Sequence, residues 1–161
     1  MSKLQKAGYV YIGMDHFAKP DDSLSVAQRE GKLHRNFQGY TTHSECDLVA
    51  MGVSAISQIG SVYYQNEHEM AAYTSAVENN SHAIKRGVSL VQDDVIRRHV
   101  ITQLICHFEL EKAHVEQLFS INFDQYFAEA QLELSAFTSD GLIELTDKSI
   151  KVTPAGRLLI R

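Results

Sequence analysis

The chain has 161 residues, of which 44% are hydrophobic, and carries a formal net charge of -5 at pH 7 with a pI near 5.9. This hydrophobic content suffices for one domain or two small modules and argues against a disordered chain. The acidic balance argues against a general nucleic-acid binder, because such proteins bind phosphates through lysine and arginine. No apolar run has the length of a transmembrane helix or the form of a secretory signal, which predicts a cytoplasmic protein.

The chain is expected to begin in the middle of an α/β unit. Residues 2–8, "SKLQKAG", are typical of the last turn of a helix closed by Gly8. Residues 9–14, "YVYIGM", have the continuous apolar character of a strand covered on both faces, which favours parallel neighbours. Nothing before Gly8 could supply the crossover that such a neighbour needs. The strand Tyr9–Met14 would then expose an apolar edge, which predicts a tendency to self-associate.

A short helix and two strands are expected next. Pro20 marks a turn, and the helix that follows it ends at Gly31. Residues 47–57, "DLVAMGVSAIS", and residues 61–66, "SVYYQN", are typical of two strands joined near Gly60.

The rest of the chain is predicted to be mainly helical. Met70, Tyr73 and Val77 recur at helical spacing and indicate a connecting helix within residues 67–88. Asp93 opens a long helix, and two shorter helices follow, the last ended by Gly141. The apolar positions are Ile96, Val100, Leu104 and Phe108 in the first of these, Val115, Leu118 and Phe119 in the second, and Phe123, Phe127, Ala130, Leu134 and Phe137 in the third.

A hairpin closes the predicted architecture. Ile143 and Leu145 are expected to face Ile150 and Val152 across the turn "TDKS", and Thr153 is a candidate N-cap for a final helix. Three helices and a hairpin make the outline of a winged helix. The third helix, where a DNA-reading helix would lie, holds four acidic residues and no lysine or arginine, so we expect no nucleic-acid binding.

The expected fold class is therefore α+β, with remnant strands of a partial α/β barrel followed by a mainly helical, winged-helix-like C-terminal module. The expected division is residues 1–66 for the barrel remnant, 67–88 for the connecting helix and 89–161 for the helical module. The chain ends on "RLLIR", an apolar run without a stop signal, so this end is also expected to be cut.

Asp15 and His16 directly follow a buried-type strand, and a carboxylate beside an imidazole could hold a ligand or shuttle a proton. The alternative is that Asp15 only ends the strand and His16 packs. Cys46 and Cys106 are sixty positions apart, which gives no disulfide framework and no local metal pair. We therefore expect no metal site on this chain.

The segment "HRNFQGYTTH", residues 34–43, combines aromatic faces with amide groups and a glycine. Phe37 and Tyr40 could stack on a planar group, and Asn36 and Gln38 could hydrogen-bond to it, which suits an adenine or an amino-acid zwitterion. The alternative is a loop that satisfies its own backbone.

A basic cluster surrounds Gly31. Lys32 and Arg35 belong to it and could bind carboxylates, because arginine grips a carboxylate through two parallel hydrogen bonds. The alternative is that these side chains are only solvated charges on the surface.

Several exact runs in order, "YIGMDHFAKPDD", "HRNFQGYTT", "MGVSAISQIG", "IRRHVITQLICHF" and "VTPAGRLLIR", resemble the oxygen-independent coproporphyrinogen III oxidases (coproporphyrinogen III dehydrogenases) of the radical S-adenosylmethionine family. The resemblance covers essentially the whole chain and corresponds to the C-terminal part of those enzymes. It implies oxidative decarboxylation of two propionates of coproporphyrinogen III to give protoporphyrinogen IX in haem biosynthesis. It further implies S-adenosylmethionine and a [4Fe-4S] cluster as cofactors.

The resemblance also assigns residues. Ile56 matches a family position that touches S-adenosylmethionine, and Gln38 matches another. The cluster needs the family's C-x-x-x-C-x-x-C signature, which Cys46 and Cys106 cannot supply. This implies that no catalytic residue lies in this fragment, that the fragment alone is inactive, and that a missing N-terminal radical domain carries the cluster. A haem-chaperone relative and a non-catalytic acidic winged-helix interaction module are the alternatives.

Overall fold

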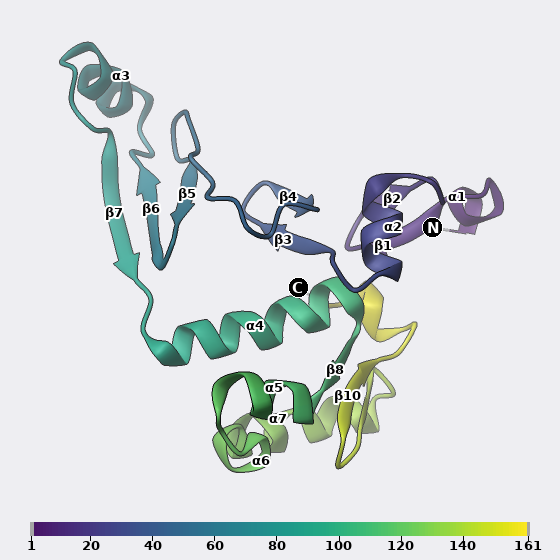
Figure 1. Ribbon diagram of the computed structural model, residues 1–161. Coiled ribbons are helices and arrows are strands. Elements are labelled where there is room, and N and C mark those ends of the chain that lie inside the picture. The colour runs from purple at the N-terminus through teal and green to yellow at the C-terminus, as the bar shows by residue number, and fades with distance from the viewer. Residues whose placement is uncertain (1, 161) are drawn as a thin grey trace. The chain divides into compact units, whose positions relative to one another are not determined.

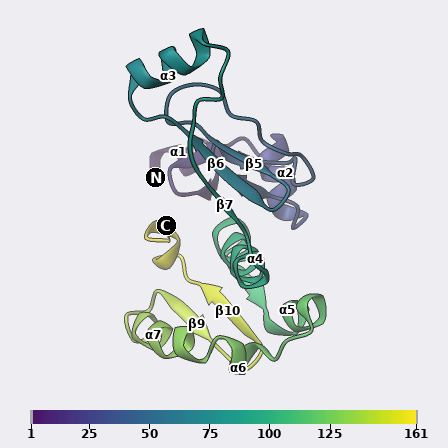
Figure 2. The same ribbon diagram turned by 90° about the vertical axis from the view of Figure 1, so that its left-hand side faces the viewer.

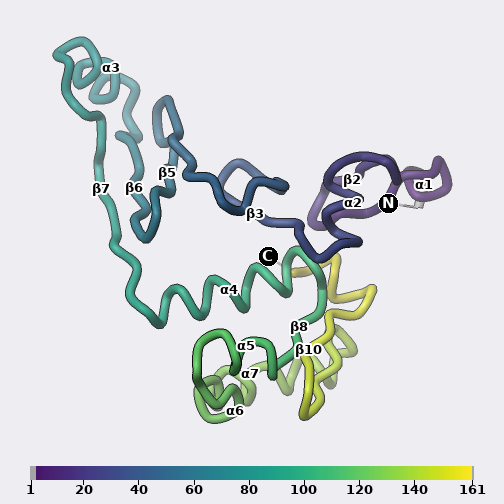
Figure 3. Tube along the Cα trace, viewed as in Figure 1, coloured from purple at the N-terminus to yellow at the C-terminus, as the bar shows by residue number. Residues whose placement is uncertain are grey.

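The structure is a computed structural model that describes residues 2–160. The chain divides into two compact units, with the dividing point inside a long helix, α4 (Gln92–His107). The first unit comprises the chain up to Arg35, Tyr40–Ser44 and the chain from Arg98 onward; the second comprises Asn36–Gly39 and Glu45–Arg97. Figure 1 labels the elements, and the Cα tube in Figure 3 traces their connections.

The first unit begins with α1 (Ser2–Lys6), β1 (Val10–Gly13), β2 (His16–Ala18) and α2 (Ser23–Arg29). Strand β1 pairs antiparallel with β2, and the parallel neighbours expected for it stay a prediction. Only two residues join the strands, and so short a connection permits only antiparallel pairing. The short helix and its glycine stop are confirmed: the Asp22 side chain caps α2 by accepting from the Leu24 amide at 2.9 Å.

A small apolar core holds this part together. Ile12, Leu33 and Cys106 are 0–2% exposed, and Ala18 and Ala27 complete the cluster. The core joins the start of the chain to α4, because Cys106 lies in the last turn of that helix. Ile12 at the centre of β1 is thus covered within the chain, and self-association through this strand stays a prediction.

The remaining helices of the first unit are α5 (Lys112–Phe119), α6 (Phe123–Tyr126) and α7 (Ala128–Ser139), with a 3-10 turn, η1, at Gly156–Leu158. The apolar stripe of α4 is confirmed, with Ile96, Val100 and the following Phe108 all buried. The single third helix is wrong, because the chain breaks at Phe127 between α6 and α7. The rings of Phe123 and Phe127, four residues apart, meet at 4.8 Å inside the core.

A three-stranded antiparallel sheet packs with these helices, in the order β8 (Glu109–Glu111), β10 (Ser149–Val152), β9 (Ile143–Leu145). The hairpin is confirmed in register, since Ile150 pairs with Leu145 and Val152 with Ile143. The third strand, β8, was not expected from the sequence. Figure 2 shows α7 beside β9, the contact that covers the hairpin.

A buried lysine ties the short helices together. The Lys112 side chain is 7% exposed, and its Nζ donates to Asp124 Oδ1 at 2.7 Å and to Gln131 Oε1 at 3.1 Å. The Lys112 ammonium holds the pKa of the Asp124 carboxyl below its usual range, chiefly through this hydrogen bond. One cation at the start of α5 therefore fixes α6 and α7 relative to it.

The second unit is built on a sheet with the order β5 (Ile56–Ile59), β6 (Val62–Asn66), β7 (Ile84–Ser89), in which neighbours are antiparallel. Of the strand expected at residues 47–57, only the end lies in β5, and Leu48 pairs separately with Gln58. The helix expected within residues 67–88 is shorter, because α3 spans Met70–Glu78 and β7 follows. The hairpin β3 (His34–Asn36) and β4 (Gly39–Thr41) turns at residues 37–38.

This second unit has almost no apolar core. Among its described residues the only buried apolar side chain is Ile96, in α4, and the other buried residues, Ser57 and Asn66, are polar. Every residue of β7 is exposed. Backbone pairing rather than apolar burial therefore holds this sheet, and both of its faces retain accessible side chains.

The half-buried histidines of α4 give the fold a pH dependence. Burial lowers the pKa of His99 and of His107, with nearby His34 adding to both effects. Each folded-state pKa is then below the unfolded value, so the stabilisation is present above about pH 6.5 and is lost as the pH falls below it. We expect denaturant midpoints to drop between about pH 7.5 and pH 5.5, and to drop less in His99→Leu. His43→Gln, on an exposed residue, is the control, and an equal drop in all three proteins would contradict this account.

Candidate functional site

The candidate cofactor residue Ile56 lies on one face of the β5-β6-β7 sheet. In the register of this sheet Ile56 stands opposite Gln65, and Gln65 stands opposite Arg86. Directly opposed residues in antiparallel strands project to the same face. Ile56, Gln65 and Arg86 therefore form one row across three strands.

A second row on that face carries an aromatic pair. Tyr63 stands opposite Gln58 on one side and Val88 on the other. The ring of Phe37 meets the ring of Tyr63 edge-on, with centroids 5.1 Å apart and an interplanar angle of 88°. Phe37 comes from the tip of the β3-β4 hairpin, so that tip lies against the face that carries Ile56.

The other candidate cofactor residue, Gln38, is next to Phe37 at this tip. Its backbone amide donates to Asn36 Oδ1 at 2.8 Å, which fixes the turn and uses the Asn36 side chain for local structure. The structure thus brings the segment carrying Gln38 and the sheet carrying Ile56 together within the second unit.

The candidate substrate residues belong to the first unit and differ in their surroundings. Arg35 has its guanidinium carbon 4.9 Å from the centroid of the Tyr40 ring. Burial raises the pKa of Tyr40 to about 12, with the positive charge of Arg35 opposing the rise. The Lys32 side chain is exposed, and its Nζ lies 2.8 Å from Glu30 Oε2. Arg35 is therefore the better placed of the two, because a half-buried guanidinium loses less hydration when it takes up a carboxylate.

Asp15 and His16 sit beside Arg35 and Tyr40 in the first unit. His16 Nδ1 lies 2.9 Å from Asp15 Oδ1, and the His16 ring meets the Tyr40 ring edge-on at 5.2 Å. Gly13 allows this arrangement, since a side chain there would collide with the Tyr40 hydroxyl. The pair thus shares one neighbourhood with Arg35, a grouping that the sequence did not indicate.

Among residues 2–160, no group of cysteine, histidine, aspartate or glutamate side chains is arranged to hold a metal ion. Cys46 is exposed, and Cys106 lies in the apolar core, where burial raises the pKa of its thiol to about 12. A [4Fe-4S] cluster needs three thiolates, and this sequence has two cysteines in unlike surroundings. The residues described here therefore do not fit a [4Fe-4S] cluster.

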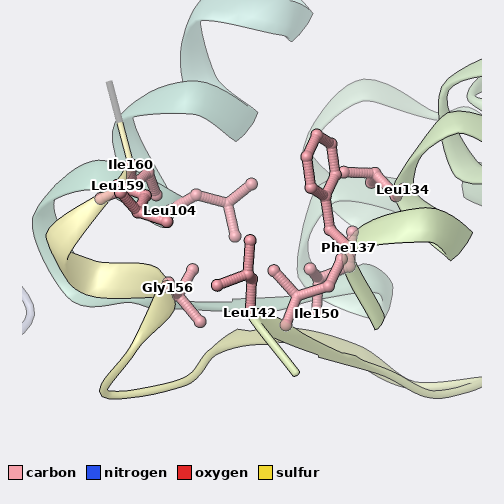
Figure 4. A pocket seen from close by; sticks show the side chains of 10 residues that line it. Leu104, Leu134, Phe137, Leu142, Ile150, Gly156, Leu159 and Ile160 are labelled. Atoms are coloured by element: carbon pink, nitrogen blue, oxygen red, sulfur yellow. The ribbon is translucent and has the colours of Figure 1, made fainter. Parts of the chain in front are cut away.

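An apolar cavity of about 300 Å³ opens within the first unit (Figure 4). Side chains from α4, α7 and the β9-β10 hairpin line it together with the segment after η1. The lining residues are Leu104, Leu134, Phe137, Leu142, Ile143, Ile150, Val152, Gly156, Leu159 and Ile160. With no charged group in its wall, this cavity suits an apolar occupant and not the carboxylates considered above.

Arg86 and Gln65, which share a face of the sheet with Ile56, were not among the residues singled out from the sequence. The usable signal is the alternation of residues 86–89, "RGVS", which places Arg86 and Val88 on one side of a strand. The expected connecting helix over residues 67–88 concealed it, because that interpretation assigned these residues the wrong period.

No helix of the described residues is long and apolar enough to cross a membrane.

Comparison with known proteins gives consistent results. Residues 90–159 match the family described as the HemN C-terminal domain. Oxygen-independent coproporphyrinogen III oxidase of Pseudomonas aeruginosa is 55% identical over 159 residues, covering 99% of this chain and 35% of the relative. The Escherichia coli (strain K12) protein of the same name is 53% identical over 158 residues, covering 98% of this chain and 35% of the relative.

A solved structure shares the fold. It is titled "Coproporphyrinogen III oxidase (HemN) from Escherichia coli is a Radical SAM enzyme" and aligns with a TM-score of 0.92 at 52% identity, over 99% of this chain and 37% of that chain. The chain thus spans about a third of the length of these relatives. Along its length the chain is therefore similar to one part of the oxygen-independent coproporphyrinogen III oxidases, and its residues 90–159 match the HemN C-terminal domain.

Proposed function

We propose that this chain forms the C-terminal part of an oxygen-independent coproporphyrinogen III oxidase, which converts two propionates of coproporphyrinogen III to vinyl groups and so yields protoporphyrinogen IX. The observation that carries the proposal is the 55% identity to an oxidase of that name over 99% of this chain. The solved relative, a radical SAM enzyme by its title, supports it at a TM-score of 0.92.

In this proposal the face of β5-β6-β7 that carries Ile56 binds S-adenosylmethionine. An apolar side chain beside an aromatic pair suits the packing of an adenine or ribose, and the Gln38 amide suits a hydrogen bond to a polar edge. When bound, S-adenosylmethionine would supply the radical chemistry that the decarboxylation requires. The part played by this chain is to hold and orient the nucleoside.

The cluster itself must come from another part of the complete protein. Three thiolates are needed to hold it, and this sequence has two cysteines, one of them in the apolar core. We therefore propose that an N-terminal radical domain supplies the cluster and that this chain alone does not turn over substrate.

Arg35 is proposed to hold a propionate of the substrate, with Lys32 in a weaker role. Guanidinium and carboxylate form paired hydrogen bonds, and a partly desolvated guanidinium binds a carboxylate more strongly than an exposed ammonium does. The contact of Arg35 with the Tyr40 ring supports this ranking.

The direct test is a chimera in which this chain replaces the matching part of the Escherichia coli relative, to which it is 53% identical over 158 residues. We expect the chimera to load its cluster and to form protoporphyrinogen IX under anoxic conditions, because the surfaces that meet the rest of the enzyme should be preserved. Product is measured by chromatography after oxidation to the porphyrin. A folded, cluster-loaded chimera without turnover would refute the proposal.

Ile56→Asp in that chimera should weaken S-adenosylmethionine binding by about tenfold or more, since a carboxylate loses hydration when an adenine or ribose packs against it. Equilibrium binding by calorimetry gives the dissociation constant. Ile59→Asp is the matched control, because Ile59 lies in the same strand and projects to the opposite face. Equal affinities in the two variants would remove Ile56 from the site.

Arg35→Ala should raise the KM for coproporphyrinogen III by roughly tenfold with a smaller change in kcat, because it removes a contact to substrate remote from the reacting carbon. Lys32→Ala should change the KM less, and the double variant should resemble Arg35→Ala. Arg29→Ala serves as control, since Arg29 donates to the Pro20 carbonyl at the surface. An unchanged KM in the double variant would exclude both residues from substrate binding.

A further inference from the structure

We infer that Arg86 binds a carboxylate of the ligand held at the sheet face that carries Ile56. This inference rests on the proposed function and adds a residue that the sequence resemblance did not assign. The chemistry is that of a guanidinium with a carboxylate, which both coproporphyrinogen III and S-adenosylmethionine possess.

The placement of Arg86 follows from the register of the sheet. Gln65 lies between Ile56 and Arg86, directly opposite each of them. Neighbouring strands are about 4.8 Å apart, so Arg86 starts roughly 10 Å from Ile56 on the same face. An arginine side chain spans most of that distance, which puts its guanidinium within reach of any ligand that covers Ile56.

Hydrogen bonds direct the side chain toward Ile56. Arg86 Nε and Nη2 donate to Gln65 Oε1 at 3.0 Å and 2.8 Å. Gln65 Nε2 in turn donates to the Ser54 carbonyl at 2.9 Å. The Ser54 backbone is itself held, because its amide donates to the Glu67 carbonyl at 2.7 Å. The guanidinium is thereby held over β6, the strand next to Ile56.

The charge of Arg86 is not cancelled by this arrangement. Its partner Gln65 is a neutral amide, whereas the adjacent Lys85 has its Nζ 3.1 Å from Glu67 Oε2. A guanidinium has five N–H donors, and the two bonds to Gln65 use only part of them. The arrangement therefore orients a full positive charge and keeps donors for a ligand.

The surrounding face suits a ligand that is both anionic and planar. The Phe37–Tyr63 pair lies in the row next to Arg86, and Val88 is half exposed in the same row. Aromatic and apolar side chains bind the flat part of such a ligand, and one arginine fixes its carboxylate. The alternative is that Arg86 is only a solvated surface residue. In that case its substitution would leave the affinity for both probes unchanged.

The test uses the chimera with its cluster kept oxidised, so that binding is read without turnover. Two probes are titrated: coproporphyrin III by its fluorescence, and S-adenosylhomocysteine by calorimetry. The variants are Arg86→Gln and Arg86→Lys. Lys85→Gln is the matched control, because it removes one positive charge from the same strand at a residue whose Nζ already pairs with Glu67 Oε2 at 3.1 Å.

We expect Arg86→Gln to weaken one probe by about tenfold and Lys85→Gln to leave both within about twofold. Arg86→Lys should recover part of the loss, because it restores charge but not the paired hydrogen bonds. Loss confined to coproporphyrin III assigns Arg86 to the substrate, and loss confined to S-adenosylhomocysteine assigns it to the cofactor.

Equal affinities in Arg86→Gln and Lys85→Gln would overturn this assignment and leave the proposed function intact. If the unsubstituted chimera bound neither probe, the proposed function would fall, and the role of Arg86 with it. The two failures are thus distinguishable by the behaviour of the unsubstituted protein.

Discussion

The packing of Ile12 and Leu33 against Cys106 is the constraint on which the first unit depends. It joins the start of the chain to the end of α4, and Gln28 reinforces it by donating to the carbonyls of Ile12 at 2.6 Å and Cys106 at 3.2 Å. The Tyr11 hydroxyl adds a second long-range bond, to the Arg157 carbonyl at 2.9 Å. Cysteine suits the central position because it is a small apolar residue whose thiol stays protonated there. This core fixes the positions of the residues on β1 and β2.

The second unit is held together by hydrogen bonds of buried polar side chains. Its two described buried residues outside α4 act through hydrogen bonds: the Ser57 hydroxyl accepts from the Ala50 amide at 2.9 Å, and Asn66 Nδ2 donates to the Gly52 carbonyl at 2.9 Å. These bonds anchor the loop before β5 without an apolar core. The consequence for function is that the sheet keeps an accessible face, on which Ile56, Gln65 and Arg86 stand in one row.

The β3-β4 hairpin shows why one short segment carries two kinds of candidate residue. Arg35 lies in strand β3 and stacks on Tyr40, whereas Phe37 lies at the tip of the hairpin and packs on Tyr63. The sequence resemblance named Gln38, and the basic cluster around Gly31 named Arg35, within four positions of each other, but the contacts assign the tip to one unit and Arg35 to the other. Cofactor and substrate roles are accordingly proposed for different parts of this hairpin.

The sequence by itself determined the helices with strong periodicity, the register of the β9-β10 hairpin and, through exact runs, the family resemblance, because these depend on near neighbours along the chain. It did not indicate the antiparallel pairing of β1 or the break at Phe127. It also did not indicate strand β7, which depends on pairing with β6 across the intervening helix α3. Ile56 and Gln38 could be named from a matching run, whereas Arg86 could not. Its position opposite Gln65 exists only after β6 and β7 have paired, and that pairing is a property of the tertiary structure.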